Sequence, residues 1–90
     1  MAMVAVKIRI MPFSPDVNTK KIGEKAKEII ESSSGKNCTI SEEKIAFGLK
    51  AIIAFFAWPE DEEIESLEQK LRKIKDISSV QVIDMRRAVG

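Results

Sequence analysis

Ninety residues suffice for one small domain, so residues 1–90 are treated as a single domain and a large multi-domain enzyme is excluded. The 44% of hydrophobic residues can form one thin core. Fifteen basic residues against 14 acidic residues give a net charge of +1, so no bulk charge attracts the chain to nucleic acid or to an anionic membrane.

The first predicted element is a strand over residues 4–11, because apolar and other side chains alternate there. One face carries branched residues, and these are Val4, Val6, Ile8 and Ile10. The other face carries Ala5, Lys7, Arg9 and Met11. Two prolines within residues 12–15 end the strand, since proline lacks a backbone donor and biases the preceding residue away from helix.

A helix is predicted from Asn18, which suits an N-cap, to about Ser32. Its apolar positions recur at helical spacing and are Ile22, Ala26, Ile29 and Ile30. Gly23 is expected to weaken this helix. The polar residues 36–44 follow and are expected to form a short edge strand, with Cys38, Ile40 and Glu42 on one side.

Residues 46–58 are apolar on both faces and rich in aromatic and branched side chains, which is typical of a central strand, and Pro59 stops it. The acidic residues 60–65 then lead into a helix, because carboxylates suit the positive end of the helix dipole. The buried stripe of this helix is Ile64, Leu67, Leu71 and Ile74. Residues 79–85 alternate as a last strand, with Val80 and Val82 opposite Gln81, Ile83 and Met85. Residues 86–90 form a basic tail.

This order of elements predicts an α+β protein with the ferredoxin-like βαββαβ sandwich, a four-stranded antiparallel sheet with two helices on one face. Right-handed crossovers place the strands over residues 4–11 and 46–58 in the middle of the sheet. These two segments also carry the strongest apolar signals. The face without helices is then either a surface of ordinary mixed polarity or a docking surface for another macromolecule.

The side chains that carry most enzyme chemistry are scarce. The chain has no His, no Tyr and one Cys, Cys38. This composition lacks a Ser-His-Asp triad, a Cys-His pair, a zinc cluster and a Cys-x-x-Cys redox motif. The acidic residues 60–65 do not converge on a single point, and nothing in the sequence supplies a base for Cys38. We therefore expect no enzyme activity, no metal site and no cofactor.

The location of the protein follows from its cysteine usage and its apolar segments. One cysteine cannot form an internal disulfide, which fits a reducing cytosol. No apolar segment approaches the roughly 20 residues that span a bilayer, and residues 1–10 alternate where a secretion signal would be continuously apolar. We expect a soluble, cytoplasmic protein without direct membrane contact.

Two alternatives use the same topology. An RNA-binding module would carry stacking aromatic residues on its two central strands, but residues 4–11 contain none and the expected RNA-binding pattern is broken at residues 44–49. Direct nucleic-acid binding is therefore not expected. A small-ligand-sensing dimer that uses the open sheet face is the other alternative, and it predicts a defined dimer in solution.

Three segments are specific beyond this topology. Residues 4–12 read Val-Ala-Val-Lys-Ile-Arg-Ile-Met-Pro and are followed by Ser-Pro-Asp-Val at 14–17. Residues 45–51 read Ile-Ala-Phe-Gly-Leu-Lys-Ala, and residues 82–87 read Val-Ile-Asp-Met-Arg-Arg. Together they resemble the archaeal elongation factor 1-beta family, over nearly the whole chain. The resemblance implies a ferredoxin-like guanine-nucleotide exchange domain that promotes exchange of GDP for GTP on its partner GTPase, elongation factor 1-alpha.

The resemblance also implies site residues. Phe47 matches a family aromatic that packs into a pocket of the GTPase, and Lys50 lies in the same block. The basic end matches the part of the family that reaches the magnesium and phosphate site, so Arg86 and Arg87 are candidates for displacing Mg²⁺. Alignment through Met85 places Arg87 where eukaryotic relatives have a lysine.

The site residues keep alternative interpretations at this point. Phe47 could instead be a core side chain at the start of a central strand. Lys7 and Arg9, candidates for partner binding on the open face, could be charges that aid solubility. Arg86 and Arg87 could belong to a frayed terminus.

Overall fold

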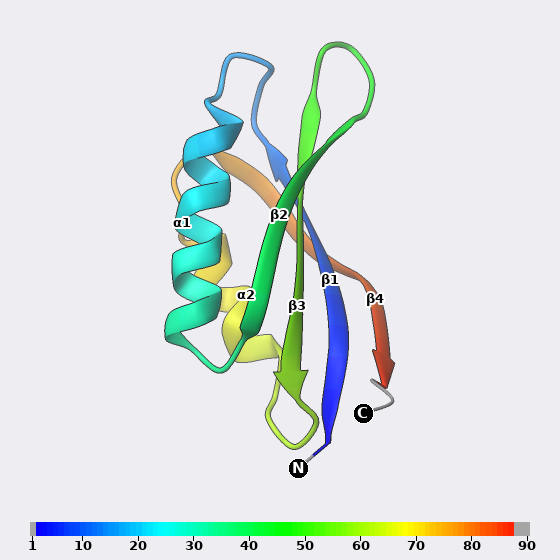
Figure 1. Ribbon diagram of the computed structural model, residues 1–90. Helices are drawn as coiled ribbons and strands as arrows, with labels where there is room; N and C mark the ends of the chain where they lie inside the picture. Colours follow the sequence, from blue (N-terminus) through cyan, green and yellow to red (C-terminus); the bar gives the residue numbers. More distant parts are fainter. Residues whose placement is uncertain (1, 88–90) are drawn as a thin grey trace.

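The computed structural model describes residues 2–87, which form one antiparallel sheet with two helices on one face (Figure 1). The strands are β1 (Met3–Pro12), β2 (Lys36–Lys44), β3 (Lys50–Pro59) and β4 (Ile77–Arg87). The helices are α1 (Thr19–Ser32) and α2 (Glu65–Arg72). The sheet order is β2-β3-β1-β4, so β1 and β3 are central. The predicted ferredoxin-like fold and the predicted central strands are both confirmed.

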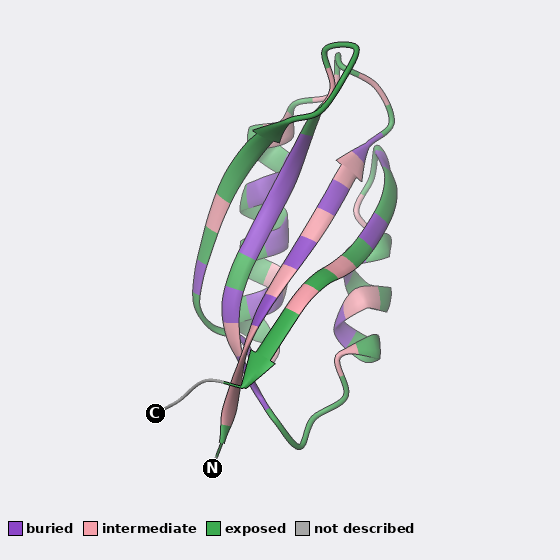
Figure 2. Cartoon of the chain, turned by 90° about the vertical axis from the view of Figure 1, so that its right-hand side faces the viewer, coloured by how far each residue is buried: buried purple, intermediate pink, exposed green. Residues whose placement is uncertain are grey.

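The core lies between the helices and one face of the sheet. β1 alternates as predicted: Val6, Ile8 and Ile10 are wholly buried, while Lys7 and Arg9 on the opposite face are half-buried. The helices contribute the predicted apolar stripes, with Ile22, Ala26, Ile30, Leu67 and Leu71 buried. β3 contributes Ile52, Ala54, Phe56 and Trp58. The other face of the sheet is covered by no helix of the described chain and remains open (Figure 2).

Helix α1 begins where the sequence predicts. The Asn18 side chain accepts a hydrogen bond from the Lys21 backbone N–H at 3.2 Å, so it caps the first turn. Gly23 is buried, and a β-carbon added there would lie 2.8 Å from Cγ2 of Ile40 on β2. The glycine that lowers helix propensity therefore allows α1 to approach the sheet closely.

The structure corrects the predicted limits of two strands. β3 begins at Lys50, so residues 46–49, predicted as strand, form a turn. β4 extends two residues beyond the prediction at each end and includes Arg86 and Arg87, which were predicted in a tail. The rest of that tail, residues 88–90, lies outside the described residues.

A β-bulge in β4 overturns the predicted facing of Met85. The register passes from Lys7 opposite Asp84 to Ile8 opposite Val82, so Ile83 is an extra residue. One extra residue reverses the alternation of side chains that follow it. Met85 therefore lies opposite Val6, on the helix side of the sheet, and not with Gln81 as the simple alternation predicts.

Candidate functional site

Phe47 lies at the tip of the turn between β2 and β3. The turn is closed by a hydrogen bond from the Leu49 N–H to the Ala46 carbonyl oxygen at 3.0 Å. Phe47 is 95% exposed, so the interpretation of Phe47 as a core side chain is wrong. The hairpin projects beyond the rest of the sheet at one end of the molecule (Figure 1).

The backbone at this tip is unusual. Phe47 has φ of 57° and Gly48 has φ of 78°, and positive φ at both central positions is the signature of a type I′ turn. Glycine accepts this conformation readily, but a bulky residue there is an outlier, and such strain clusters at functional sites. The Phe-Gly pair after a polar strand therefore indicated a turn in the sequence. Because residues 46–58 are mostly apolar, they were predicted as one strand and this turn was missed.

Lys50 begins β3 at the base of the same hairpin. Its Nζ lies 4.0 Å from Oε1 of Glu42 on β2. Glu42 also accepts a hydrogen bond from the Thr19 hydroxyl, which joins the hairpin to the start of α1. The charge of Lys50 is thus partly balanced within the chain, and its side chain helps to hold the hairpin base.

Lys7 and Arg9 lie side by side along the open face of β1. The Lys7 ammonium is 5.9 Å from the ring centroid of Phe55, which is 45% exposed on β3. Arg9 Nη2 donates a hydrogen bond to Oε1 of Gln81 at 2.9 Å, while Arg9 Nε is buried and has no hydrogen-bond partner among the described residues. The open face therefore presents two ordered cations beside one aromatic ring.

Arg86 and Arg87 close β4 at the end of the molecule opposite the hairpin. Arg86 lies opposite Ala5 on the open face, and its Nε is 3.1 Å from Asp84 Oδ2. Arg87 lies opposite Val4 on the helix side and donates a hydrogen bond to Glu60, just after β3. This contact raises the pKa of Arg87 above its ordinary value, first through the hydrogen bond and then through the carboxylate charge.

The sequence-predicted residues therefore occupy three separate places. The molecule is 41 Å long, with Phe47 and Lys50 at one end and Arg86 and Arg87 at the other. Lys7 and Arg9 lie between them on β1, on the open face of the sheet that Figure 2 shows. Two residues that the sequence analysis did not select also belong here: Glu60, which holds Arg87, and Phe13, which is 71% exposed in the β1–α1 loop. Pro12 and Pro15 flank Phe13. This segment was interpreted only as the end of a strand, so Phe13 was not considered as a site residue.

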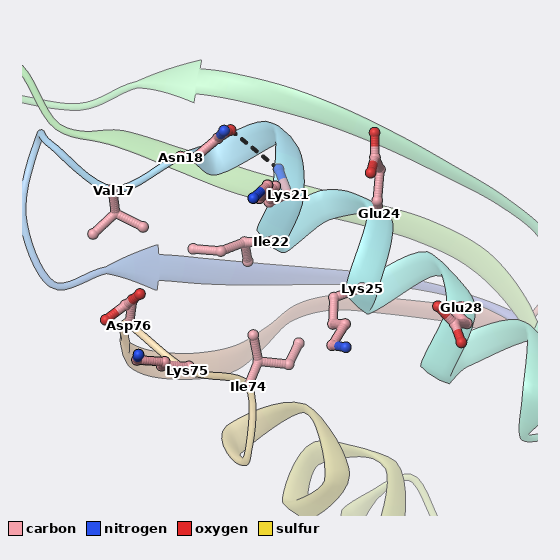
Figure 3. A pocket seen from close by; sticks show the side chains of 10 residues that line it. All are labelled: Val17, Asn18, Lys21, Ile22, Glu24, Lys25, Glu28, Ile74, Lys75 and Asp76. Carbon is pink, nitrogen blue, oxygen red and sulfur yellow. Dashed lines mark hydrogen bonds between the residues drawn. The ribbon is translucent and has the colours of Figure 1, made fainter.

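A hollow of about 460 Å³ adjoins Arg87 and Glu60, and one of about 360 Å³ adjoins Lys50. Other hollows lie away from these residues. One of about 430 Å³ lies between α1 and the loop that joins α2 to β4 (Figure 3). Val17, Ile22 and Ile74 form its floor, while its other lining residues are polar or charged. Six of the ten lining residues are charged: Lys21, Glu24, Lys25, Glu28, Lys75 and Asp76. Mixed charges around a shallow floor describe a solvated groove and provide no convergent set of groups for chemistry.

Cys38 is buried on β2 and belongs to the core cluster. Burial raises the pKa of its thiol to about 11, with a smaller contribution from Glu31. The thiol is therefore protonated at neutral pH and is a poor nucleophile. Within residues 2–87 no group of three potential ligands is arranged to hold a metal ion, and no helix there is long and apolar enough to cross a membrane.

Comparison with solved structures defines the class of fold. The ACT domain from the GTP pyrophosphokinase of Chlorobium tepidum superposes with a TM-score of 0.63, covering 92% of this chain and all of that domain. Sequence identity is 19%, so this likeness concerns the fold alone. The chain is a ferredoxin-like α+β domain.

Sequence comparison then identifies the family. Residues 5–88 match the EF-1 guanine nucleotide exchange domain. The elongation factor 1-beta of Methanocaldococcus jannaschii is 38% identical over 89 residues, covering 98% of this chain and all of the relative. That of Methanosarcina barkeri is 39% identical over 88 residues, covering 97% and 99%. The chain belongs to the EF-1 guanine nucleotide exchange domain family, and its role is nucleotide exchange in translation elongation.

Proposed function

We propose that this chain accelerates the release of GDP from elongation factor 1-alpha and that it does so without catalytic chemistry of its own. GTPases of this class hold GDP through backbone amides, a lysine and Mg²⁺ around the phosphates. A protein that binds best when these contacts are broken lowers the affinity for the nucleotide, and by reciprocity the returning nucleotide lowers the affinity for that protein. No bond to the protein is formed or broken in this scheme.

The separation of the two ends carries the proposal. Phe47 is exposed on a protruding turn, as a docking residue must be, and the two arginines lie at the other end of a molecule 41 Å long. A domain of this length can rest on one part of a GTPase while its far end reaches the nucleotide site. Arg86 and Arg87 would then compete with Mg²⁺ for the phosphate oxygens, since guanidinium binds phosphate strongly.

The open face supports a lesser role in the same complex. Lys7 lies beside Phe55 and Arg9 donates a hydrogen bond to Gln81, so neighbouring strands hold two cations in place on the open face, where they would meet carboxylates of a partner. Membership of the exchange family favours this protein partner over RNA or a small ligand. Because elongation factors act beside the ribosome, we place the chain in the cytoplasm.

The decisive experiment measures how fast labelled GDP leaves purified elongation factor 1-alpha in excess unlabelled nucleotide. We expect the rate of GDP release to rise toward a plateau as the chain is added. When a chelator removes Mg²⁺, the rates with and without the chain should differ less, because the contact between Mg²⁺ and the phosphates is already lost. Heat-denatured chain is the control. No acceleration at saturating chain would refute the proposal.

A further inference from the structure

Phe13 is an exposed ring that the functions above leave unused. It is 71% exposed in the loop between β1 and α1, at the same end of the molecule as Phe47 (Figure 1). Single exposed apolar residues are ordinary, but apolar residues that gather at one place on the surface mark interaction sites, and phenylalanine is enriched at the centres of protein interfaces. The end of the sheet that carries the β2–β3 turn therefore presents two aromatic rings on two loops.

The two loops are neighbours in space. A β-carbon placed on Gly48, next to Phe47, would lie 3.7 Å from Cβ of Pro15, which is two residues after Phe13. The hydrogen bond between Thr19 and Glu42 also joins the start of α1 to the strand that leads into the turn. Ile45, which is 42% exposed, adds apolar surface on the hairpin side.

The backbone that displays Phe13 is well held. The Phe13 N–H donates to the Asp76 carbonyl oxygen at 3.0 Å, which ties the loop to the start of β4. The Ser78 hydroxyl donates to the Pro12 carbonyl oxygen at 3.4 Å, and the Val17 N–H donates to that of Ser14 at 3.3 Å. A ring on a preorganised backbone loses little conformational entropy on binding. Phe13 is thus suited to be an interface anchor.

We propose that Phe13 and Phe47 together form a two-ring docking end that inserts into an apolar hollow on the partner GTPase. This inference rests on the proposed function, because it extends the docking surface around Phe47 to the adjoining loop. The two rings are the apolar anchors, and the exposed Ile45 adds apolar surface on the hairpin side. The charges at the base of the hairpin, Lys50 and Glu42, already pair with each other, so a partner need not neutralise them.

A second copy of this chain fits the two rings poorly. Pairing of two identical ends requires a self-complementary surface, but this end consists of projecting rings. The hollow between the two loops is bordered largely by polar groups, including Ser14, Asn18, Thr19, Lys20 and Glu42. The groove beside α1 is rimmed by charges. Neither offers the apolar walls that a phenylalanine ring needs. The hollow at the strand end has apolar lining residues, among them Val4, Trp58 and Met85, but it also contains four glutamates and Arg87. We therefore place the complementary apolar hollow on the partner protein.

The test compares Phe13→Ala with wild-type chain in two measurements: binding to nucleotide-free GTPase by calorimetry, and GDP release as a function of chain concentration. Loss of an anchor ring weakens binding by roughly 5- to 30-fold. We expect the half-saturating concentration to rise by that factor while the plateau release rate is unchanged. Phe13→Leu keeps an apolar side chain and should keep most of the wild-type affinity. This variant therefore also tests the inference if Phe13→Ala folds poorly.

Ile83→Ala provides the control, because Ile83 is 40% exposed at the bulge of β4 and is apolar but lies outside the two loops. Equal affinity of Phe13→Ala and wild type would overturn the inference and leave the exchange function intact. A wild-type chain that binds but does not accelerate release would refute the exchange function alone. A wild-type chain that does neither refutes both. Sedimentation of wild type as a dimer and of Phe13→Ala as a monomer would assign the rings to self-association and overturn the inference.

Discussion

The two ends of the sheet present opposite chemistry. At the hairpin end, Phe47 and Phe13 expose rings on two touching loops, and the backbone of Phe47 is held at positive φ. At the strand end, Arg86 and Arg87 expose charge, and each is paired with a carboxylate on its own face of the sheet. Apolar rings give affinity by leaving water, whereas cations act at short range on phosphate and metal. In the proposed mechanism, docking and displacement are therefore separated at the two ends of the molecule.

Removal of both arginines should give the largest effect. In Arg86→Ala/Arg87→Ala the plateau rate of GDP release is expected to fall by roughly 10- to 100-fold, because charged hydrogen bonds to phosphate contribute that much. Affinity for nucleotide-free GTPase should change far less. Stopped-flow release with labelled GDP and calorimetry separate the two quantities. A parallel loss of affinity and plateau rate would show that the strand end also docks.

The single variants sharpen this result. Arg86 faces the open side and Arg87 the helix side, so only the side turned to the nucleotide should carry the loss. Arg86→Lys and Arg87→Lys are matched controls that keep the charge and remove the planar fork.

The hairpin end should respond in the opposite way. Phe47→Asn is expected to raise the half-saturating concentration for GDP release by roughly 5- to 30-fold while leaving the plateau unchanged. Asparagine tolerates positive φ better than phenylalanine, so the free energy of unfolding should rise by about 0.5–1 kcal/mol. Urea unfolding followed by circular dichroism measures this gain.

A Phe47→Asn variant with a lower half-saturating concentration and a lower free energy of unfolding than wild type would contradict both parts of this prediction. Phe47→Leu is the control, because leucine keeps an apolar side chain in the same strained conformation. The stability of Phe47→Leu should remain near that of wild type, and its affinity for the GTPase should lie between those of wild type and Phe47→Asn.

The smallest effect concerns the contact that holds Arg87. Glu60→Gln removes its charged partner, so Arg87 no longer has to leave a carboxylate before it meets phosphate. Exposed pairs of this kind are weak, so the plateau release rate should rise by only about two- to threefold and less at high salt. Glu63→Gln removes the same charge from the same loop, and Glu63 makes no ion pair within residues 2–87. A slower Glu60→Gln variant would mean that Glu60 orients Arg87 for displacement.

Much of the fold was predictable because periodicity reflects burial directly. The alternation of β1 and the stripes of α1 and α2 each predicted the buried face correctly, and their order predicted the sheet topology. The same reasoning failed at residues 46–49, where an apolar composition concealed a turn. It also failed at Met85, because a bulge is a single extra residue and leaves no periodic signal.

The candidate site was less predictable than the fold. The resemblance selected Phe47 and the two arginines, but exposure and facing are properties of neighbouring strands. Glu60 lies 27 residues from Arg87 in the chain, and only the pairing of β4 with β1 beside the end of β3 brings them together. The position of the Phe13 loop beside the β2–β3 turn likewise depends on a contact between distant segments, which the sequence does not reveal.

The amino-acid sequence by itself determined the order of strands and helices, the buried faces of β1, α1 and α2, and that reactive side chains are scarce. These properties follow from local spacing and composition, which act before any distant contact forms. Tertiary structure decided that Phe47 faces solvent, which face of the sheet Arg86 and Arg87 each occupy, and that two rings share one end. Those outcomes depend on strand register and loop contact, and such long-range geometry is set only when the whole sheet assembles.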